Sequence, residues 1–252
     1  MKTFLRKGLI GLAMAASALA LSSSGLAMTV QPVVVNLVTS GRGMTQVVTV
    51  ENTFANPLPV EIRVVELALG ENGVTSKETD PGDLLIFPPQ ALIQPGQTQT
   101  FRIQYVGDPD LAASKHYYVT VAQLPVQLPQ GQSAIQILYN FQILVSVAPQ
   151  GAKPDVKILA SEVGHNAAGK PVPAITLGNA SRAHGYLSQG RLRIVQRDSA
   201  GKEVFRKTMS GPEIQQTVGF GLVGAGQTRK VLLPVELPQE GGSLDAQFTP
   251  DG

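Results

Sequence analysis

The side chains with the widest chemical use are the three histidines, His116, His165 and His184. A histidine can act as a general acid, a general base or a metal ligand because its pKa lies near neutrality. None of the three has the spacing of a metal-binding H-x-x-x-H pair, and none lies near a Gly-x-Ser-x-Gly nucleophile motif. We therefore expect surface or turn histidines rather than catalytic ones.

The acidic residues and the cysteine count narrow the chemistry further. Asp108-Pro109-Asp110 is the shortest-spaced acidic cluster, but it supplies far fewer ligands than a calcium loop, and turn chemistry accounts for it. There is no cysteine, so a thiolate nucleophile, a disulfide framework and a cysteine metal site are all excluded. Arg191, Arg193 and Arg197 give one strand a basic face of the kind that is usually solvated. We expect no metal, no cofactor and no enzymatic activity.

The N-terminus has the organisation of a secretory signal peptide. Basic residues within 1–7 precede an apolar run over 8–21 and a small-residue site that ends at Ala27. Cleavage there removes three basic residues and no acidic one, so the formal net charge falls from +2 to −1. A nearly neutral chain lacks the basic excess of nucleic-acid-binding proteins. Because no later run reaches about eighteen apolar residues, we expect an exported protein that is not embedded in a membrane.

Between residues 28 and 149, short β-rich runs alternate with turns that contain Gly, Pro, Asn or Asp. The expected strands are 30–38, 46–50, 60–69, 84–87, 98–106, 116–124 and the long stretch 134–149. Seven such strands are typical of an immunoglobulin-like β-sandwich.

A second β-rich unit follows the Pro- and Gly-rich break at 149–154, which we interpret as a hinge. Its expected strands are 156–160, 174–178, 190–196, 203–208 and 228–237, with a hairpin tip at 199–202. Only residues 110–113 have the composition of a helical turn, and the tail after Pro238 is expected to be loosely held. The prediction is an all-β protein with a signal peptide (1–27), an N-terminal domain (28–149) and a C-terminal domain (150–252).

The most regular stretch is 134–149, where every odd position from Ile135 to Val147 is large and apolar. Side chains alternate in direction along a strand, so these residues share one face. Thirteen residues at about 3.3 Å each span roughly 43 Å, which is long for a strand in a compact domain. Two interpretations follow: a long core strand of the sandwich, or a strand whose apolar face is partly reserved for a partner.

Several short motifs occur in a defined order along the N-terminal domain. They are Thr49-Val50-Glu51-Asn52, Phe87-Pro88-Pro89, Gln94-Pro95-Gly96, Thr100-Phe101-Arg102-Ile103, Tyr117-Tyr118-Val119 and Leu124-Pro125, followed by the alternating stretch and Pro149. In this order and spacing the sequence resembles the periplasmic chaperones of the chaperone-usher pathway of pilus and fimbria assembly, in an archaic or alternate branch. The resemblance implies two immunoglobulin-like domains in an L-shaped arrangement.

The resemblance also implies a mode of action. The last strand of the first domain would complete a pilin or fimbrial subunit by donor-strand complementation, a form of β-augmentation. The residues of this sequence that correspond to the family's donor positions are Ile135, Ile137, Tyr139, Phe141 and Ile143. The implied partners are the subunit, an outer-membrane usher and, for the free chaperone, a second copy that pairs through the donor strand.

One departure from the family concerns the subunit's terminal carboxylate. Many members bind it with two basic residues, whereas the corresponding positions here look like Asn36 and Leu144. Arg102 is the candidate replacement, and the alternative is an ordinary strand arginine with its head in solvent. The rival function is an exported two-domain adhesin or carbohydrate-binding module, but the absence of tryptophan leaves few stacking platforms for a sugar.

Overall fold

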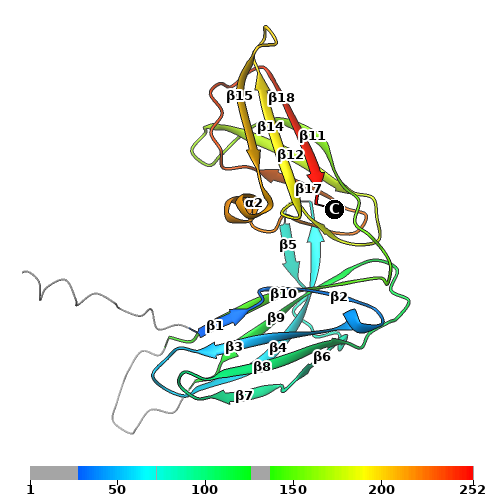
Figure 1. Ribbon diagram of the computed structural model, residues 1–252, viewed down its shortest axis with the longest axis vertical. Coiled ribbons are helices and arrows are strands. Elements are labelled where there is room, and N and C mark those ends of the chain that lie inside the picture. Colours follow the sequence, from blue (N-terminus) through cyan, green and yellow to red (C-terminus); the bar gives the residue numbers. More distant parts are fainter. Residues whose placement is uncertain (1–27, 72, 126–136, 252) are drawn as a thin grey trace, which may run out of the picture.

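The computed structural model describes residues 28–71, 73–125 and 137–251. They form two β-sandwich units set in an L, joined near residue 150 (Figure 1). Each unit has its own hydrophobic core, the first built from residues between Met28 and Val147 and the second from residues between Ile175 and Leu233. The predicted fold class is confirmed, and the predicted domain boundary after Pro149 lies between the two cores.

The first unit packs two sheets against each other. One sheet has the order β1-β3-β8-β6, and its strands are β1 (Met28–Gln31), β3 (Thr45–Asn52), β8 (Thr98–Tyr105) and β6 (Leu84–Phe87). The other has the order β2-β10-β9-β4-β5, with β7 paired to β4; its strands are β2 (Val34–Val38), β10 (Asn140–Ala148), β9 (Lys115–Gln123), β4 (Leu58–Gly70), β5 (Gly73–Ser76) and β7 (Gln90–Ile93). A 3-10 helix, η2 (Arg42–Met44), connects β2 to β3.

The expected strand 30–38 is two strands that belong to different sheets. β1 pairs with β3, whereas β2 runs parallel to β10. The break falls at Pro32, which has no N–H to donate to a ladder and so does not continue a paired strand. As a consequence, β2 pairs with β10 only from Leu144 to Ala148. The candidate site lies on the part of β10 before Leu144.

The second unit is also strand-rich. Its sheets are β11-β12-β17, β13-β16 and β15-β14-β18. The strands are β11 (Val156–His165), β12 (Pro171–Asn179), β13 (Gly185–Tyr186), β14 (Gly190–Arg197), β15 (Glu203–Met209), β16 (Leu222–Val223), β17 (Thr228–Leu232) and β18 (Ser243–Pro250). The predicted hairpin tip joins β14 to β15, with Gly201 at a positive φ of 80°.

Two expectations for local structure were wrong. Residues 110–113 lie in the irregular connection between β8 and β9, and the helix is instead α2 (Gly211–Val218). The Glu213 carboxylate accepts hydrogen bonds from the backbone N–H and the hydroxyl of Ser210, at 2.7 Å each, and Pro212 lies in the first turn. Ser-x-x-Glu with an early proline is a recognised helix start, so the signal was present in the sequence.

The C-terminal tail is a full strand rather than a loose end. β18 pairs with β14 at eight consecutive positions. Leu244, Ala246 and Phe248 alternate along it and pack against the second core. Burial of this alternating face explains why the tail is ordered.

Candidate functional site

The apolar stripe divides into a buried half and an exposed half. Ile143, Val145 and Val147 are at most 1% exposed and belong to the first core. The assignment of Ile143 as a donor position is therefore corrected, because its side chain already fills the space between the two sheets of its own domain. Phe141 is half-buried and packs against the same core.

The exposed half comes just before β10. Ile137, Leu138 and Tyr139 are 70%, 43% and 37% exposed. Tyr139 is anchored to Gln123 by two hydrogen bonds: the Gln123 N–H donates to the Tyr139 carbonyl at 3.0 Å, and the Tyr139 N–H donates to Oε1 of Gln123 at 3.2 Å. Its ring also makes a tilted contact with Phe54, at 5.5 Å between centroids. Three consecutive large apolar side chains are therefore exposed on a segment that hydrogen bonds fix to Gln123. Ile135, the first predicted donor position, lies outside the described residues.

The backbone beside this segment has an open edge. β10 pairs with β9 from Asn140 to Val147 but with β2 only from Leu144 onward. The Leu144 N–H donates to the Val33 carbonyl at 3.0 Å, so by alternation the N–H and C=O groups of Asn140 and Gln142 face the same side. No strand in the described part of the chain pairs with that side of residues 140–143. An added strand would find both main-chain partners and apolar side chains there.

Arg102 is not brought to this site. It is an exposed residue on β8, which belongs to the sheet that does not contain β10. Its register neighbours are Val47 on β3 and Phe87 on β6, both exposed. This placement agrees with the ordinary strand arginine, and we do not assign Arg102 to the binding of a carboxylate.

The positions that look like the family's basic residues have different roles here. Leu144 is half-buried and pairs with Val34 in the β2–β10 ladder. Asn36 joins the two domains, because its Oδ1 accepts hydrogen bonds from the Tyr186 hydroxyl and from Nε2 of His184, at 2.8 Å each. The basic pair is thus replaced by uncharged groups.

Two histidines lie buried at this junction, contrary to the expectation of surface or turn histidines. The His116 and His184 rings meet edge to face, 5.3 Å apart, and Nδ1 of His116 lies 2.9 Å from the Ser146 hydroxyl. Burial lowers the pKa of His116 to about 3, with a further contribution from His184, and burial lowers the pKa of His184 to about 4. Burial raises the pKa of Tyr186 to about 12, so all three are neutral at pH 7. His165, in contrast, is an exposed residue at the end of β11.

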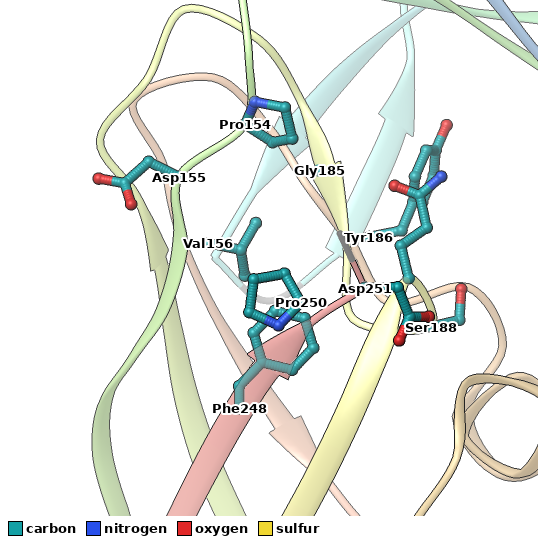
Figure 2. Close-up of a pocket in the computed structure, with 10 residues that line it drawn as sticks. Pro154, Asp155, Val156, Gly185, Tyr186, Ser188, Phe248, Pro250 and Asp251 are labelled. Atoms are coloured by element: carbon teal, nitrogen blue, oxygen red, sulfur yellow. The ribbon is translucent and has the colours of Figure 1, made fainter.

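Two hollows flank the junction. One, of about 780 Å³, lies between the domains, with Val33 and Val47 on one side and Gln215 and Phe220 on the other. The second, of about 380 Å³, lies in the C-terminal domain (Figure 2). Tyr186 forms part of its wall, and the tyrosine hydroxyl points away from Phe248 and Pro250. In the described residues, no three His, Asp or Glu side chains gather in a metal-binding arrangement. No helix of the described residues is both long and apolar enough to cross a bilayer.

Comparison with known families identifies the chain. Residues 28–153 match the N-terminal domain of PapD, described as a pili and flagellar-assembly chaperone. The chain belongs to this chaperone family. The match begins at the first described strand and ends just past the predicted domain boundary. The resemblance seen in the sequence is therefore confirmed.

Solved structures of chaperones share the fold at low sequence identity. The SafB chaperone in complex with the Salmonella enterica SafA pilin has 14% identity and a TM-score of 0.53, covering 89% of this chain and 96% of that one. The YadV chaperone has 14% identity and a TM-score of 0.51, covering 88% and 91%. The class 5 fimbriae chaperone CfaA has 12% identity and a TM-score of 0.50, covering 89% and 100%. A comparison with curated proteins found no match.

The junction is the part of the site that sequence reasoning missed. Asn36, His116, Ser146 and Tyr186 lie on four different strands, and His184 lies just before β13. The one available signal was Asn36, a polar residue on the otherwise apolar strand β2. Polar groups in such positions are usually satisfied by partners that only the fold supplies.

Proposed function

We propose that this pilus-assembly chaperone captures a pilin or fimbrial subunit by donor-strand complementation and delivers it to an outer-membrane usher. The observation that carries the proposal is the exposed segment Ile137–Tyr139 continuous with the open edge of Asn140–Ile143. The edge offers the hydrogen bonds of a β-ladder, and the side chains offer apolar area. The role is binding rather than catalysis.

The donor positions we retain are Ile137, Tyr139 and Phe141, together with Ile135 from the sequence alone. Phe141 is half-buried in the chaperone, so it contributes less new buried area than Ile137. Leu138 points to the opposite side of the segment and is also exposed. Ile143 stabilises the site indirectly, because its buried side chain fixes β10 to the core of the first domain.

The interdomain hollow adjoins the open edge. Val33 lines the hollow and also accepts the hydrogen bond from Leu144, at the point where β2 begins to cover β10. A subunit strand added along Asn140–Ile143 would therefore end against β2 and beside the hollow. We propose that this hollow holds the end of the subunit, with the bulk of the binding energy from apolar contact.

Membership of the chaperone family favours this role over that of an adhesin or sugar-binding module. Membership of the chaperone family supplies a role for an exposed apolar segment, which would otherwise promote aggregation. We propose that the chaperone acts in the periplasm after cleavage at Ala27, and that in the free state the donor segments of two copies pair. We also propose that the boundary between the two domains lies after Pro149.

The test is the double variant Ile137→Ser with Tyr139→Ser, co-expressed in the periplasm with a pilin subunit. Burying the two side chains contributes roughly 2 to 4 kcal/mol gross, so we expect about a 30- to 1000-fold loss of affinity. Circular dichroism establishes that the variant is folded. Leu92→Ser is the matched control, since Leu92 is 61% exposed on β7, away from the open edge.

Retention of the subunit by the folded double variant at the wild-type level would refute the donor assignment. Equal loss in Leu92→Ser would show that general surface hydrophobicity, and not this segment, holds the subunit. Sedimentation of the free protein tests the self-association proposal, because the double variant should be monomeric at concentrations where the wild type pairs.

A further inference from the structure

The hydrogen-bonded centre of the contact between the two domains is built from uncharged side chains. The side chains that meet around the two histidines are Asn36, Ser114, His116 and Ser146 from the first domain, and His184 and Tyr186 from the second. Every side-chain ion pair among the described residues lies within one domain. The remaining hydrogen bonds between the domains are few, such as the Ser114 N–H to the Arg182 carbonyl at 3.0 Å and the Gln227 amide to the Leu69 carbonyl at 3.0 Å.

The hydrogen-bond network determines which nitrogen of His184 carries the proton. The Asn36 Oδ1 is an acceptor only, so Nε2 of His184 must donate to it. In the neutral ring Nδ1 is then an acceptor, and the Ser114 hydroxyl, 3.0 Å away, can donate either to it or to the Arg182 carbonyl at 3.4 Å. The same hydroxyl oxygen accepts the His184 backbone N–H at 2.9 Å. The neutral form of His184 is therefore fully bonded.

A proton added to the His116 ring has no acceptor at this junction, and a positive charge on either ring is costly because both rings are buried. Nε2 of His116 is buried and has no hydrogen-bond partner among the described residues, so a protonated ring would place an N–H there without an acceptor. The two rings are 5.3 Å apart, so two imidazolium charges would also repel each other. Separation of the domains relieves both penalties, because it returns the rings to water.

We propose that the His116–His184 pair is an acid-sensitive latch between the domains. Neutral histidines hold the L-shaped arrangement of Figure 1, and protonation loosens it. Loosening changes the interdomain hollow that adjoins the open edge of β10. The chaperone's binding geometry therefore depends on pH through residues that do not contact the donor segment.

The charged groups around His116 and His184 do not compensate for the positive charge of a protonated ring. Glu66, Lys77 and Lys115 line a small hollow together with His116. Glu66 is paired with Lys77 at 2.8 Å and Lys115 with Asp83 at 2.9 Å. From β2 and β10 the pair meets only Asn36 and Ser146, and from β13 only the neutral Tyr186. No carboxylate forms a hydrogen bond to either imidazole in the described structure.

The expected size of the effect follows from proton linkage. The folded contact keeps both pKa values well below the ordinary histidine value near 6.5, so the contact is at full strength above that pH and is lost progressively below it. For each histidine that is solvated on opening, the balance shifts toward the open state by about tenfold per pH unit. At pH 5.0 this amounts to about 30-fold per histidine.

The experiment measures the distance between the domains in the full chain. The sequence has no cysteine, so spin labels can be placed at Leu92→Cys on β7 and Ala200→Cys at the β14–β15 hairpin, both exposed. Electron–electron double resonance at pH 7.5 should give one narrow distance distribution. At pH 5.0 we expect a broadened or shifted distribution in the wild-type background. His184→Gln keeps a donor for Asn36 but cannot be protonated in this range, and should leave the distribution narrow at both pH values.

His165→Gln is the matched control, because His165 is exposed and far from the junction. It should retain the wild-type response. Asn36→Ala removes the hydrogen-bond acceptor for His184 and should broaden the distance distribution even at pH 7.5. This variant provides a second test if circular dichroism shows that His184→Gln is misfolded. The latch is refuted if the wild-type distribution is the same at both pH values, if His184→Gln responds like the wild type, or if His165→Gln loses the response.

Discussion

Ile137 and Ile143 provide a sharp test of how the stripe is divided. They are the same residue type, six positions apart on one predicted face, yet Ile137 is 70% exposed and Ile143 is 1% exposed. Ile143→Ala leaves a cavity in the first core and should cost about 2 to 5 kcal/mol of unfolding free energy. Ile137→Ala should cost less than about 0.5 kcal/mol, as for other exposed positions.

Urea unfolding measured by circular dichroism separates the two substitutions. With a slope of about 2 kcal/mol per molar urea, the transition of the first domain should move by about 1 to 2.5 M in Ile143→Ala and by less than about 0.3 M in Ile137→Ala. When equal amounts of folded protein are compared, Ile137→Ala should weaken subunit capture more than Ile143→Ala. Burial of Ile137 contributes roughly 1.5 to 2 kcal/mol, so its loss should weaken capture by about 10- to 30-fold.

Equal urea midpoints for the two variants would refute the division of the stripe. That result would mean that the packing of Ile143 in the first core adds nothing to stability. If Ile137→Ala were the less stable variant, the exposed segment would be part of the chaperone's own core instead of a donor.

The remaining predictions concern two charged side chains of the first domain. Arg102→Ala should leave subunit capture within about twofold of the wild type in a pulldown, since Arg102 lies on the other sheet; a tenfold loss would restore its role in binding the carboxylate. Asp83 is different, because its carboxylate accepts hydrogen bonds from Tyr117 at 2.6 Å and Lys115 at 2.9 Å. Burial by itself would raise the Asp83 pKa, but these two partners lower it, so its stabilisation is present above about pH 4 and lost as pH falls through the lowered pKa. Asp83→Asn should therefore reduce the urea midpoint at pH 7 and change it much less at pH 2.5; an equal change at both pH values would contradict this assignment.

The strands were the most predictable part of the fold because their side chains alternate locally. Leu84–Phe87 was predicted at its observed bounds, and the strands around Val119 and Ile194 differ from their predictions by at most one residue at each end. β18 has the same alternation through Leu244 and Phe248 but follows a turn-rich stretch, which led to the wrong expectation of a loose tail. α2 is a single short helix whose start signal, Ser210 to Glu213, was overlooked because no long helical period accompanies it.

For the candidate site, the sequence by itself determined which side chains form the apolar stripe, since periodicity depends only on neighbours along the chain. It did not determine where the stripe leaves its own core. That point is set by β2, a strand more than a hundred residues earlier, which covers β10 only from Leu144 onward. The histidine junction depends even more on the tertiary structure. His116, His184 and Asn36 are each unremarkable in sequence. The low pKa values of the two histidines and the hydrogen bond between His184 and Asn36 exist only because the docking of the two domains brings these residues together and removes water from around the rings.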